Sequence, residues 1–310
     1  MPSAGAGFTI LGSGFGLYGY LPALIELDVE VVLPLRYRPT LESRPELGQY
    51  LPKVVWCADT DEALAKSSGA IVAVRPADQL AWIPRLAAMP NIGRLVLEKP
   101  VAPDPQAAAV LLATLEAAGK RYRVGYTFRL MPWAQQLRMA LTGPLEGVWL
   151  DWNFLAHHYR TDLANWKRFS ATGGGALRFF GIHLIALLAE LGYDDVSAST
   201  VGGASDSETE RWEATFTGPG LCPFALRVDS RADDTCFRIV AREGGQMRTL
   251  ADQPDPFSGS VSSVFPGQDL RVGILQRLYR SFDDADELDA QRQKTIVALW
   301  ACVERKSRRG

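Results

Sequence analysis

The chain has 310 residues, of which 47% are hydrophobic and 22% are charged. This composition is typical of a folded globular protein and argues against disorder or a fibrous repeat, and the length predicts about two domains. Because 33 Lys and Arg residues nearly balance 35 Asp and Glu residues, the net charge is only −2. The charge therefore gives no support to a nucleic-acid or other polyanion partner.

The chain shows no sign of a membrane or export segment. The longest apolar run, residues 184–191, contains Glu190 and is much shorter than the roughly 20 residues of a membrane span. The N-terminal segment has no basic region before its first apolar run, so no secretory signal is expected. The cysteines are scattered without metal-ligand spacing, which predicts buried thiols of a cytoplasmic protein and no metal site. They are Cys57, Cys222, Cys236 and Cys302.

Short apolar runs alternate with helical stretches in the first part of the chain. Unalternating runs at 8–11, 29–35, 53–56, 70–74 and 94–98 are typical of strands buried on both faces of a parallel sheet. Helices are expected at 18–26, 61–66, 79–88 and 105–118, the last ending at Gly119. This alternation predicts a doubly wound α/β domain of the Rossmann type over residues 1–123.

The remainder, residues 124–310, predicts an α+β domain with a large, mostly antiparallel sheet. Strands are expected at 146–157, 210–217, 222–230, 234–242 and 246–250. A strong helix at 176–191 follows three glycines, and a loop rich in Pro, Ser and Gly is expected at 252–268. Two closing helices, near 269–282 and 284–306, can pack back on the first domain.

A glycine-rich turn, LGSGFGLYGYLPAL, follows the first predicted strand. Such a turn can bring backbone N–H groups against a pyrophosphate at a helix N-terminus. Gly14, Gly16 and Gly19 match the GxGxxG pattern literally. We prefer the register of Gly12, Gly14 and Leu17, which places the first glycine directly after the strand, although Leu17 should then hold the helix slightly further away. The alternative is a purely structural turn. The predicted nucleotide-binding residues here are Gly12, Gly14, Phe15, Gly16 and Leu17.

The end of the second strand carries arginines where NAD enzymes carry an acid. In those enzymes the carboxylate binds the ribose 2′-hydroxyl. Here Arg36 and Arg38 are present instead, and guanidinium groups suit a 2′-phosphate and adenine stacking. The sequence therefore favours NADP(H) over NAD(H) as cofactor, unless these arginines are only solvated loop residues.

Three motifs together carry a family resemblance. The glycine-rich turn is followed by Glu98-Lys99-Pro100 after the fifth strand, and by GGGALRFFGIHLIALL at 173–188. With VAVRP at 72–76, VGYTFR at 124–129 and the closing helices, the chain resembles the glucose-fructose oxidoreductase, inositol dehydrogenase and MocA (Gfo/Idh/MocA) family over essentially its whole length. The resemblance implies an NAD(P)-binding Rossmann domain and a C-terminal substrate domain that often forms an oligomer interface.

The resemblance also implies roles for single residues. Lys99 would lie beside the nicotinamide and donate a proton to the alkoxide formed by hydride transfer, and His183 would assist it. The peptide bond before Pro100 is expected to be cis. Further cofactor contacts are expected from Val74, Pro76, Glu98, Lys99, Trp166 and Lys167.

The chain departs from the family at the helix that carries His183. The aspartate usual four residues earlier is Phe179, and an acid often found three residues later is Ala186. The usual catalytic set is thus reduced to Lys99 and His183, unless another group substitutes. Candidate substitutes are His157, His158, Tyr159 and Tyr126, although loop histidines are equally consistent with the pattern. The residues predicted to bind substrate are Tyr126, His158, Tyr159, Arg178, Phe179 and His183.

These observations predict an NADP(H)-dependent oxidoreductase that acts on a keto or hydroxyl carbon of a sugar, nucleotide sugar or cyclitol, in the reductive direction. Basic residues around the triple glycine could suit an anionic substrate, or could be merely solvated. They are Arg160, Lys167, Arg168 and Arg178. The alternatives are an imine reductase or another non-dehydrogenase use of the scaffold, and a non-catalytic NADP(H) or sugar sensor. A homodimer or homotetramer is expected by family analogy.

Overall fold

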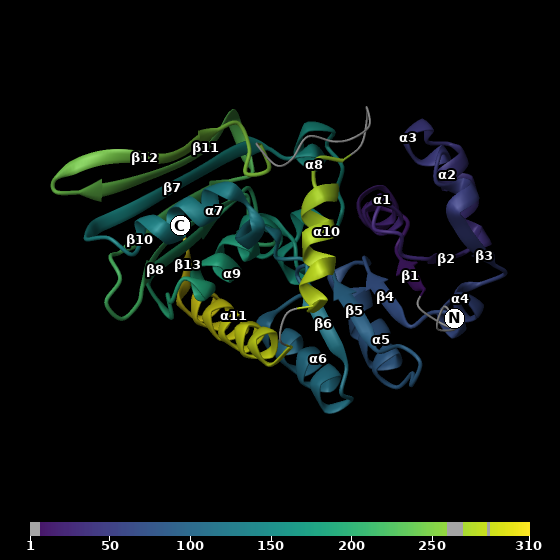
Figure 1. The fold of residues 1–310 in the computed structure, drawn as a ribbon. Helices are drawn as coiled ribbons and strands as arrows, with labels where there is room; N and C mark the ends of the chain where they lie inside the picture. Colours follow the sequence, from purple (N-terminus) through teal and green to yellow (C-terminus); the bar gives the residue numbers. More distant parts are fainter. Residues whose placement is uncertain (1–6, 259–268, 284–285) are drawn as a thin grey trace. The chain divides into compact units, whose positions relative to one another are not determined.

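The computed structural model describes residues 7–258, 269–283 and 286–310, without the side chains of 286–288. These residues cluster into two compact units, each built from three stretches of chain. Unit 1 contains residues 1–101, 110–125 and 259–289, and unit 2 contains residues 102–109, 126–258 and 290–310. The sequence predicted a single cut between residues 123 and 124. Figure 1 labels most of the helices and strands of both units.

Unit 1 contains a six-stranded, fully parallel sheet in the order β3-β2-β1-β4-β5-β6. This is the strand order of a Rossmann domain, so the predicted doubly wound fold is confirmed. The sixth strand is new, because its sequence was read as the exit from the first domain. The strands are β1 (Phe8–Leu11), β2 (Val31–Pro34), β3 (Val54–Cys57), β4 (Gly69–Val72), β5 (Arg94–Leu97) and β6 (Arg121–Val124).

Short helices and turns connect the strands of unit 1. The first predicted helix begins with a π turn. Several short turns and helices form residues 35–53, of which 36–52 had no predicted element. The elements are η1 (Gly16–Tyr20), α1 (Leu21–Ile25), η2 (Leu35–Tyr37), α2 (Arg38–Glu42), α3 (Pro45–Gly48), η3 (Leu51–Lys53), α4 (Thr60–Ala65), α5 (Pro76–Ala87) and α6 (Pro105–Ala117), the last from residue 110 onward. The later stretch of chain adds α10 (Val272–Arg280) and η8 (Ser281–Asp283) to this unit.

A buried arginine attaches the distant segment 281–289 to the sheet of unit 1. Arg123 on β6 is almost fully buried, and its Nη2 donates to the carbonyl of Ser281 at 2.6 Å. Its Nη1 lies 3.8 Å from Oδ2 of Asp289, which is buried as well. Burying a guanidinium group is costly without such partners. These contacts explain why Ser281 and Asp289 belong to the first unit, whereas residues 290–310 belong to the second.

Unit 2 contains a seven-stranded mixed sheet in the order β12-β11-β7-β10-β9-β8-β13. Most neighbours are antiparallel, as predicted, but β10 pairs with β7 and β13 pairs with β8 in parallel. The strands are β7 (Leu145–Leu155), β8 (Asp195–Gly202), β9 (Arg211–Thr217), β10 (Phe224–Asp229), β11 (Arg231–Glu243), β12 (Gln246–Gln253) and β13 (Ser307–Arg309). The loop predicted at 252–268 lies mostly outside the described residues.

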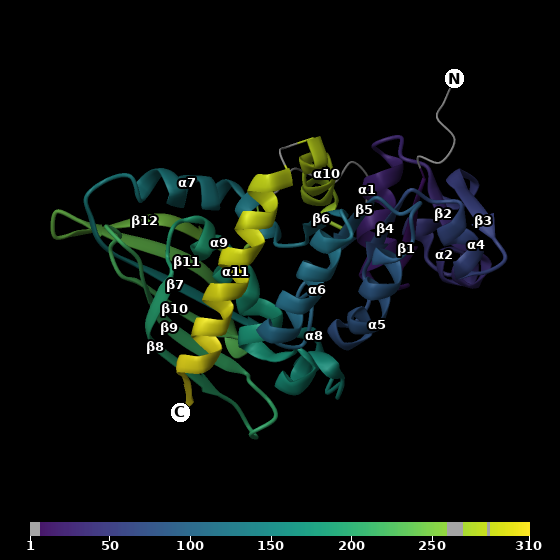
Figure 2. The same cartoon turned by 90° about the horizontal axis from the view of Figure 1, so that it is seen from below.

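Helices cover one face of this sheet, with α9 and α11 on the same side in Figure 2. The predicted helix 176–191 is divided into a π-helical turn, η7, and the α-helix α9. The turns and helices of unit 2 are η4 (Thr127–Leu130), α7 (Pro132–Ala140), α8 (His157–Arg160), η5 (Trp166–Arg168), η6 (Ser170–Thr172), η7 (Ala176–Gly181), α9 (Ile182–Glu190) and α11 (Asp286–Lys306), the last from residue 290 onward.

One helical stretch, Ser170–Glu190, is long and apolar enough to span a membrane by length and composition alone. Within the described residues, 72% of its most apolar window is buried inside the structure. That degree of burial is what the central helix of a protein core shows. We therefore interpret the stretch as the core of unit 2, where it packs against β9 and β10.

Two of the four cysteines differ from the prediction. Cys57 and Cys302 are buried, but Cys222 and Cys236 are only partly buried, so the prediction of four buried thiols is wrong for two of them. All four are free.

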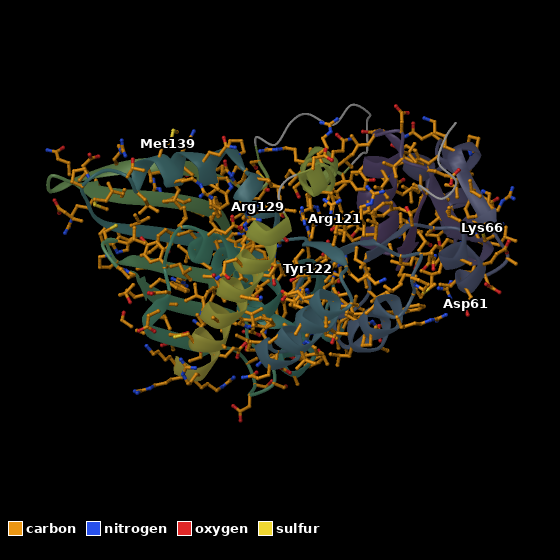
Figure 3. The ribbon with its side chains drawn as sticks, turned by 60° about the horizontal axis from the view of Figure 1, so that its bottom comes forward. Asp61, Lys66, Arg121, Tyr122, Arg129 and Met139 are labelled. Carbon is orange, nitrogen blue, oxygen red and sulfur yellow. The ribbon has the colours of Figure 1, made fainter. Side chains whose placement is uncertain are left out.

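Figure 3 shows Asp61 and Lys66 on the surface of unit 1, where Asp61 pairs with Arg85 and Lys66 with Glu62.

Candidate functional site

The glycine-rich turn after β1 requires glycine at position 12. Gly12 has a φ of +110°, and a Cβ atom there would lie 2.1 Å from the carbonyl oxygen of Ala73. Gly14 is exposed, and no atom outside its immediate neighbours lies within 4 Å of the position of its Cβ. The turn is therefore held tightly against β4 at Gly12, and Gly14 leaves its backbone open to an approaching group.

The close contact between the first helix and the sheet comes from Gly16. A Cβ at Gly16 would lie 2.7 Å from Cγ2 of Ile10 and 3.2 Å from Cβ of Ala73. Leu17 is fully buried beside it. We expected Leu17 to take the third glycine position and hold the helix away. Instead, the role of the third glycine falls one residue earlier, so the pattern in this chain is G-x-G-x-G.

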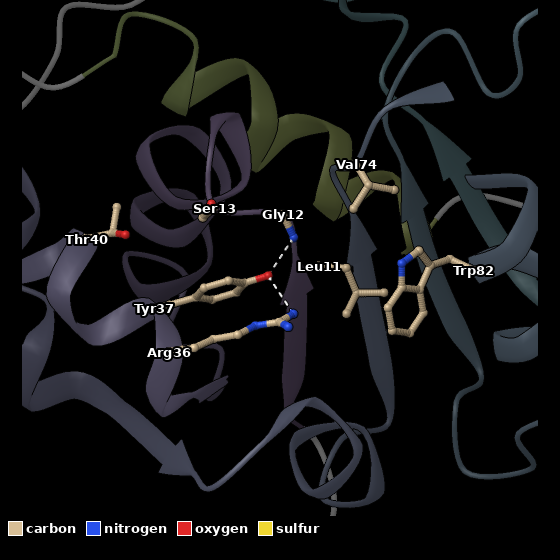
Figure 4. A pocket seen from close by; sticks show the side chains of 8 residues that line it. All are labelled: Leu11, Gly12, Ser13, Arg36, Tyr37, Thr40, Val74 and Trp82. Atoms are coloured by element: carbon tan, nitrogen blue, oxygen red, sulfur yellow. Dashed lines mark hydrogen bonds between the residues drawn. The ribbon is translucent and has the colours of Figure 1, made fainter. Parts of the chain in front are cut away.

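A cavity of about 390 Å³ lies beside this turn, at the carboxyl ends of β1, β2 and β4. The hydroxyl oxygen of Tyr37 accepts a hydrogen bond from the backbone N–H of Gly12 at 2.9 Å. Nη2 of Arg36 lies 3.4 Å from the same oxygen. Figure 4 draws both contacts of this oxygen as dashed lines. The lining residues are Leu11, Gly12, Ser13, Arg36, Tyr37, Thr40, Val74 and Trp82.

The cavity changes the predicted set of residues. Arg38 does not line it, because its side chain pairs with Glu42 along α2 at 2.8 Å instead. Pro76 is buried at the start of α5 and also lies outside the lining. Sequence reasoning missed Tyr37 and Trp82. The position of Tyr37 between the two arginines was a usable signal, whereas Trp82 is brought in by the packing of α5.

Lys99 follows β5 and is held by an amide clamp. Gln79 on α5 is fully buried, and its Nε2 donates to the carbonyl oxygens of Glu98 at 2.9 Å and Pro100 at 3.0 Å. These two carbonyls flank Lys99 on either side. The peptide bond between Lys99 and Pro100 is cis, which confirms the expectation from the resemblance. The clamp fixes the backbone from which the Lys99 side chain projects.

The neighbouring Glu98 is hydrogen-bonded inside unit 1. The hydroxyl of Tyr20 donates to its Oε1 at 2.6 Å. Burial raises the pKa of the Glu98 carboxyl, while the nearby Lys99 opposes that rise. Burial and the negative charge of Glu98 raise the pKa of Tyr20. Gly125 makes room for this pair, because a Cβ there would lie 2.9 Å from Oε1 of Glu98.

A further cation lies beside the glycine-rich turn. Cζ of Arg271 is 4.1 Å from the ring centroid of Phe15, and its Nη2 lies 2.7 Å from Oδ2 of Asp269. The ion pair raises the pKa of Arg271 against the opposing effect of burial. Sequence reasoning placed Phe15 in the site but missed Arg271, because more than 250 residues separate them in the chain.

His183 lies in the core of unit 2. It is buried on α9 and stacks on Phe128, with ring centroids 4.5 Å apart and an interplanar angle of 17°. Phe257 contacts it edge-on at 6.5 Å. The preceding π turn changes the register of the helix, so spacing by four residues across it does not by itself place two side chains on one face.

Phe179, which replaces the expected aspartate, belongs to an aromatic cluster. Its ring packs edge-on against Trp166 at 5.2 Å and Phe180 at 4.8 Å. Nζ of Lys167 lies 5.3 Å from the Phe179 ring centroid, which is within cation–π range. Gly174 permits this arrangement, because a Cβ there would lie 2.3 Å from the carbonyl oxygen of Trp166. The cluster therefore brings together Trp166, Lys167 and Phe179, and none of these three side chains is a carboxylate that could take the place of the expected aspartate.

His158 and Tyr159 form a second polar group in unit 2. Their rings lie 4.5 Å apart, and both His158 Nε2 and Tyr159 Oη are buried without a hydrogen-bond partner among the described residues. Arg168 and Arg231 lie over the Tyr159 ring, with Cζ atoms 5.0 and 5.5 Å from its centroid. Burial, with smaller contributions from Lys167 and Arg168, lowers the pKa of His158 to about 4. Burial raises the pKa of Tyr159 to about 12.

We expect His158 to make stability depend on pH. Its pKa is lower in the folded state than the ordinary value of 6.5, so the unfolded chain binds the extra proton. The contribution is present above pH 6.5 and is lost as the pH falls towards 4, by about 2–3 kcal/mol. Urea unfolding of His158→Gln between pH 7.5 and 4.5 should show a flatter profile than the wild type. The exposed His157→Gln variant should keep the wild-type slope, and equal slopes in all three proteins would contradict the expectation.

The remaining predicted substrate residues have structural contacts. Arg178 pairs with Glu304, with its Nε and Nη2 atoms 2.7 and 3.0 Å from the two carboxylate oxygens. Its Nη1 donates to the carbonyls of Pro103 and Ser170. Four of its five N–H donors are thus used, which favours a structural role over substrate binding. Tyr126 is buried, and burial raises its pKa.

Comparisons with known proteins give structural matches only. No protein-family model and no curated protein matches the sequence. The WlbA dehydrogenase from Bordetella pertussis, solved with NADH and UDP-GlcNAcA, matches with a TM-score of 0.74 and 15% identity over 99% of this chain and 96% of that one. The 3-ketoreductase KijD10 from Actinomadura kijaniata, solved with NADP and TDP-benzene, matches with a TM-score of 0.73 and 13% identity over 98% of each chain.

A third solved structure, of a repressor protein, also matches over nearly the whole chain. A super-repressor mutant of Gal80p from Saccharomyces cerevisiae matches with a TM-score of 0.69 and 14% identity over 97% of this chain and 96% of that one. At these identities, a structural match establishes the fold and leaves the activity to be argued from the site.

Proposed function

We propose that this chain, which has the fold of the Gfo/Idh/MocA oxidoreductases, is an NADP(H)-dependent oxidoreductase acting on a sugar or nucleotide-sugar carbonyl. The observation that carries the proposal is the cavity at the glycine-rich turn. It lies at the carboxyl ends of the strands, beside the centre of a sheet ordered 3-2-1-4-5-6, where such sheets bind dinucleotides.

The residues around the turn fit such a cofactor. Gly12 and Gly16 bring the backbone close to the sheet, and the open position at Gly14 lets a pyrophosphate approach the start of the helix. Arg36 lines the cavity, and none of the lining residues is acidic. A guanidinium group without a competing carboxylate supports preference for the 2′-phosphate of NADP(H).

When bound, NADPH would supply the hydride. Lys99 would donate the proton that neutralises the developing alkoxide, and the Gln79 clamp would hold the lysine backbone in place during that transfer. We assign an assisting role to His183. Phe179 cannot accept a proton, so the chain lacks the usual acidic partner of the pair. This supports the reductive direction, in which the protonated lysine can act directly.

We further propose that the substrate carries an anionic group. His158 and Tyr159 have buried polar atoms without partners in the described structure, and both side chains are neutral at pH 7. Arg168 lies beside them but already pairs with Asp162 at 3.1 Å and Glu208 at 3.2 Å, so the positive charge for such a group would come from Lys167, which is close enough to affect the pKa of His158. Neutral donors beside a lysine suit a phosphate or carboxylate. The nucleotide-bearing ligands of the WlbA and KijD10 structures are consistent with this class.

A second candidate function is non-catalytic sensing of NADP(H) or a sugar. Two observations favour it: the loss of the family's acidic partner at Phe179, and the match to a Gal80p super-repressor. Retention of Lys99 and its amide clamp favours catalysis. Tight NADPH binding without oxidation of NADPH by any member of a keto-sugar panel would favour the sensor.

Isothermal titration with NADPH and NADH tests the cofactor assignment. We expect the wild type to prefer NADPH, and Arg36→Ala to weaken NADPH binding by about 10- to 100-fold. Arg38→Ala is the matched control, because Arg38 pairs with Glu42 outside the cavity, and it should bind like the wild type. Failure of the wild type to bind either nucleotide would overturn the proposed function. Equal affinity for both nucleotides would overturn the NADP(H) preference alone.

A further inference from the structure

The hydroxyl of Tyr37 has an unusual set of neighbours for a group in a nucleotide cavity. The ring is buried beneath the glycine-rich turn, with 6% of its surface exposed. The N–H of Gly12 donates to the hydroxyl oxygen at 2.9 Å, and Nη2 of Arg36 approaches the same oxygen at 3.4 Å. Figure 4 shows both contacts converging on this one atom.

Both neighbours are donors, and this determines what the hydroxyl can do. A phenol oxygen accepts up to two hydrogen bonds and donates one. Because Gly12 and Arg36 both donate to its oxygen, the Tyr37 hydroxyl can still form one hydrogen bond as a donor, through its own proton. Arg36 is itself donor-only and lies over the Tyr37 ring, with Cζ 5.1 Å from the centroid. The two side chains therefore offer an incoming group donors and a positive charge, and no acceptor.

We propose that Tyr37 is a specificity-determining residue that donates a hydrogen bond to the 2′-phosphate of the cofactor, with Arg36 supplying the charge. This inference rests on the proposed function. A ribose 2′-hydroxyl is best held by an acceptor such as a carboxylate, whereas a phosphate oxygen accepts only. A donor-only pair thus selects the phosphorylated ribose.

The link to Gly12 gives the hydroxyl a fixed position before the cofactor arrives. Gly12 is held by its backbone conformation against Ala73, so the N–H that orients Tyr37 is itself rigidly placed. A preoriented donor loses little conformational entropy on binding. Tyr37 also lies three residues after β2, in the turn Leu35–Tyr37, close to where the acid of NAD enzymes is found.

The test compares Tyr37→Phe with the wild type by isothermal titration with NADPH, NADH, adenosine 2′-monophosphate and adenosine 5′-monophosphate. We expect Tyr37→Phe to weaken NADPH and the 2′-monophosphate by about tenfold or more and to leave NADH and the 5′-monophosphate nearly unchanged. Tyr50→Phe is the matched control, because it removes the hydroxyl of another buried tyrosine of unit 1 that lies outside this cavity.

The outcomes separate the inference from the function on which it rests. Equal weakening of NADPH and NADH would show that Tyr37 only supports the turn through Gly12, which overturns the inference. Absence of nucleotide binding by the wild type overturns the proposed function as well. A second measurement needs no variant: with ¹³C-labelled tyrosine, the 2′-monophosphate should shift the Tyr37 ring resonances, and the 5′-monophosphate should not. Equal shifts with both nucleotides would also overturn the inference.

Discussion

Replacing Lys99 by alanine should lower the turnover of a keto-sugar by about 10²- to 10⁴-fold, because the alkoxide formed by hydride transfer then lacks its proton donor. The affinity for NADPH should change little, since the cavity proposed to hold the adenosine end is lined by other residues. Stopped-flow measurement of NADPH oxidation, with the sugar on which the wild type is most active, gives the turnover, and isothermal titration gives the affinity.

Lys66→Ala provides a control for the loss of a lysine from unit 1. Lys66 is exposed on α4, where it pairs with Glu62, and its replacement should leave both measurements at wild-type values. Wild-type turnover by Lys99→Ala would remove the lysine from the chemistry. Loss of NADPH affinity without loss of turnover at saturating cofactor would instead assign Lys99 a binding role.

Replacing Gly12 by alanine should cost at least about 2–4 kcal/mol of folding free energy and should weaken nucleotide binding. Two separate effects contribute. The φ of +110° is disfavoured for any residue with a side chain, and the new Cβ would lie 2.1 Å from the backbone oxygen of Ala73. Because that oxygen belongs to the main chain, relief requires β1 and the segment after β4 to move apart. Urea unfolding measures the loss.

Gly14→Ala, in the same turn, is the matched control for stability. No atom outside its immediate neighbours lies within 4 Å of the position of its Cβ, so the free energy of unfolding should change by less than about 1 kcal/mol. Nucleotide binding should still weaken, since the methyl group would lie where the pyrophosphate approaches. Equal destabilisation by the two substitutions would contradict the assigned geometry of the turn.

Patterns local in the sequence predicted much of the fold. The unalternating runs of 8–11 and 94–98 required a sheet buried on both faces, and the parallel six-stranded sheet has this property. The strand-like runs that follow one another in the second half predicted a mostly antiparallel sheet, and most neighbours in the sheet of unit 2 are antiparallel. The exact pairing was not predictable, because the parallel pairing of β10 with β7 depends on how distant strands pack together.

In the candidate site too, some residues were predictable from the sequence and others were not. Gly12, Gly14, Arg36 and Lys99 were identifiable from the sequence, since each follows a strand and has a residue type with a specific chemical use. Which arginine lines the cavity was decided by the short turn after β2, which places Arg36 along the cavity and directs Arg38 towards Glu42. The register of the third glycine was decided by the π turn, which places Gly16 against Ile10.

By itself, the sequence determined the type of fold, the position of the glycine-rich turn and the presence of a lysine at the end of β5, because these features depend on residues close together in the chain. Only the tertiary structure decided the contacts of Tyr37 with Gly12, of Gln79 with the backbone around Lys99, and of Arg271 with Phe15. The partners in these contacts lie roughly 20 to 250 residues apart. They come into contact only when the parallel strands place their carboxyl ends side by side, and a local sequence pattern cannot predict such a contact.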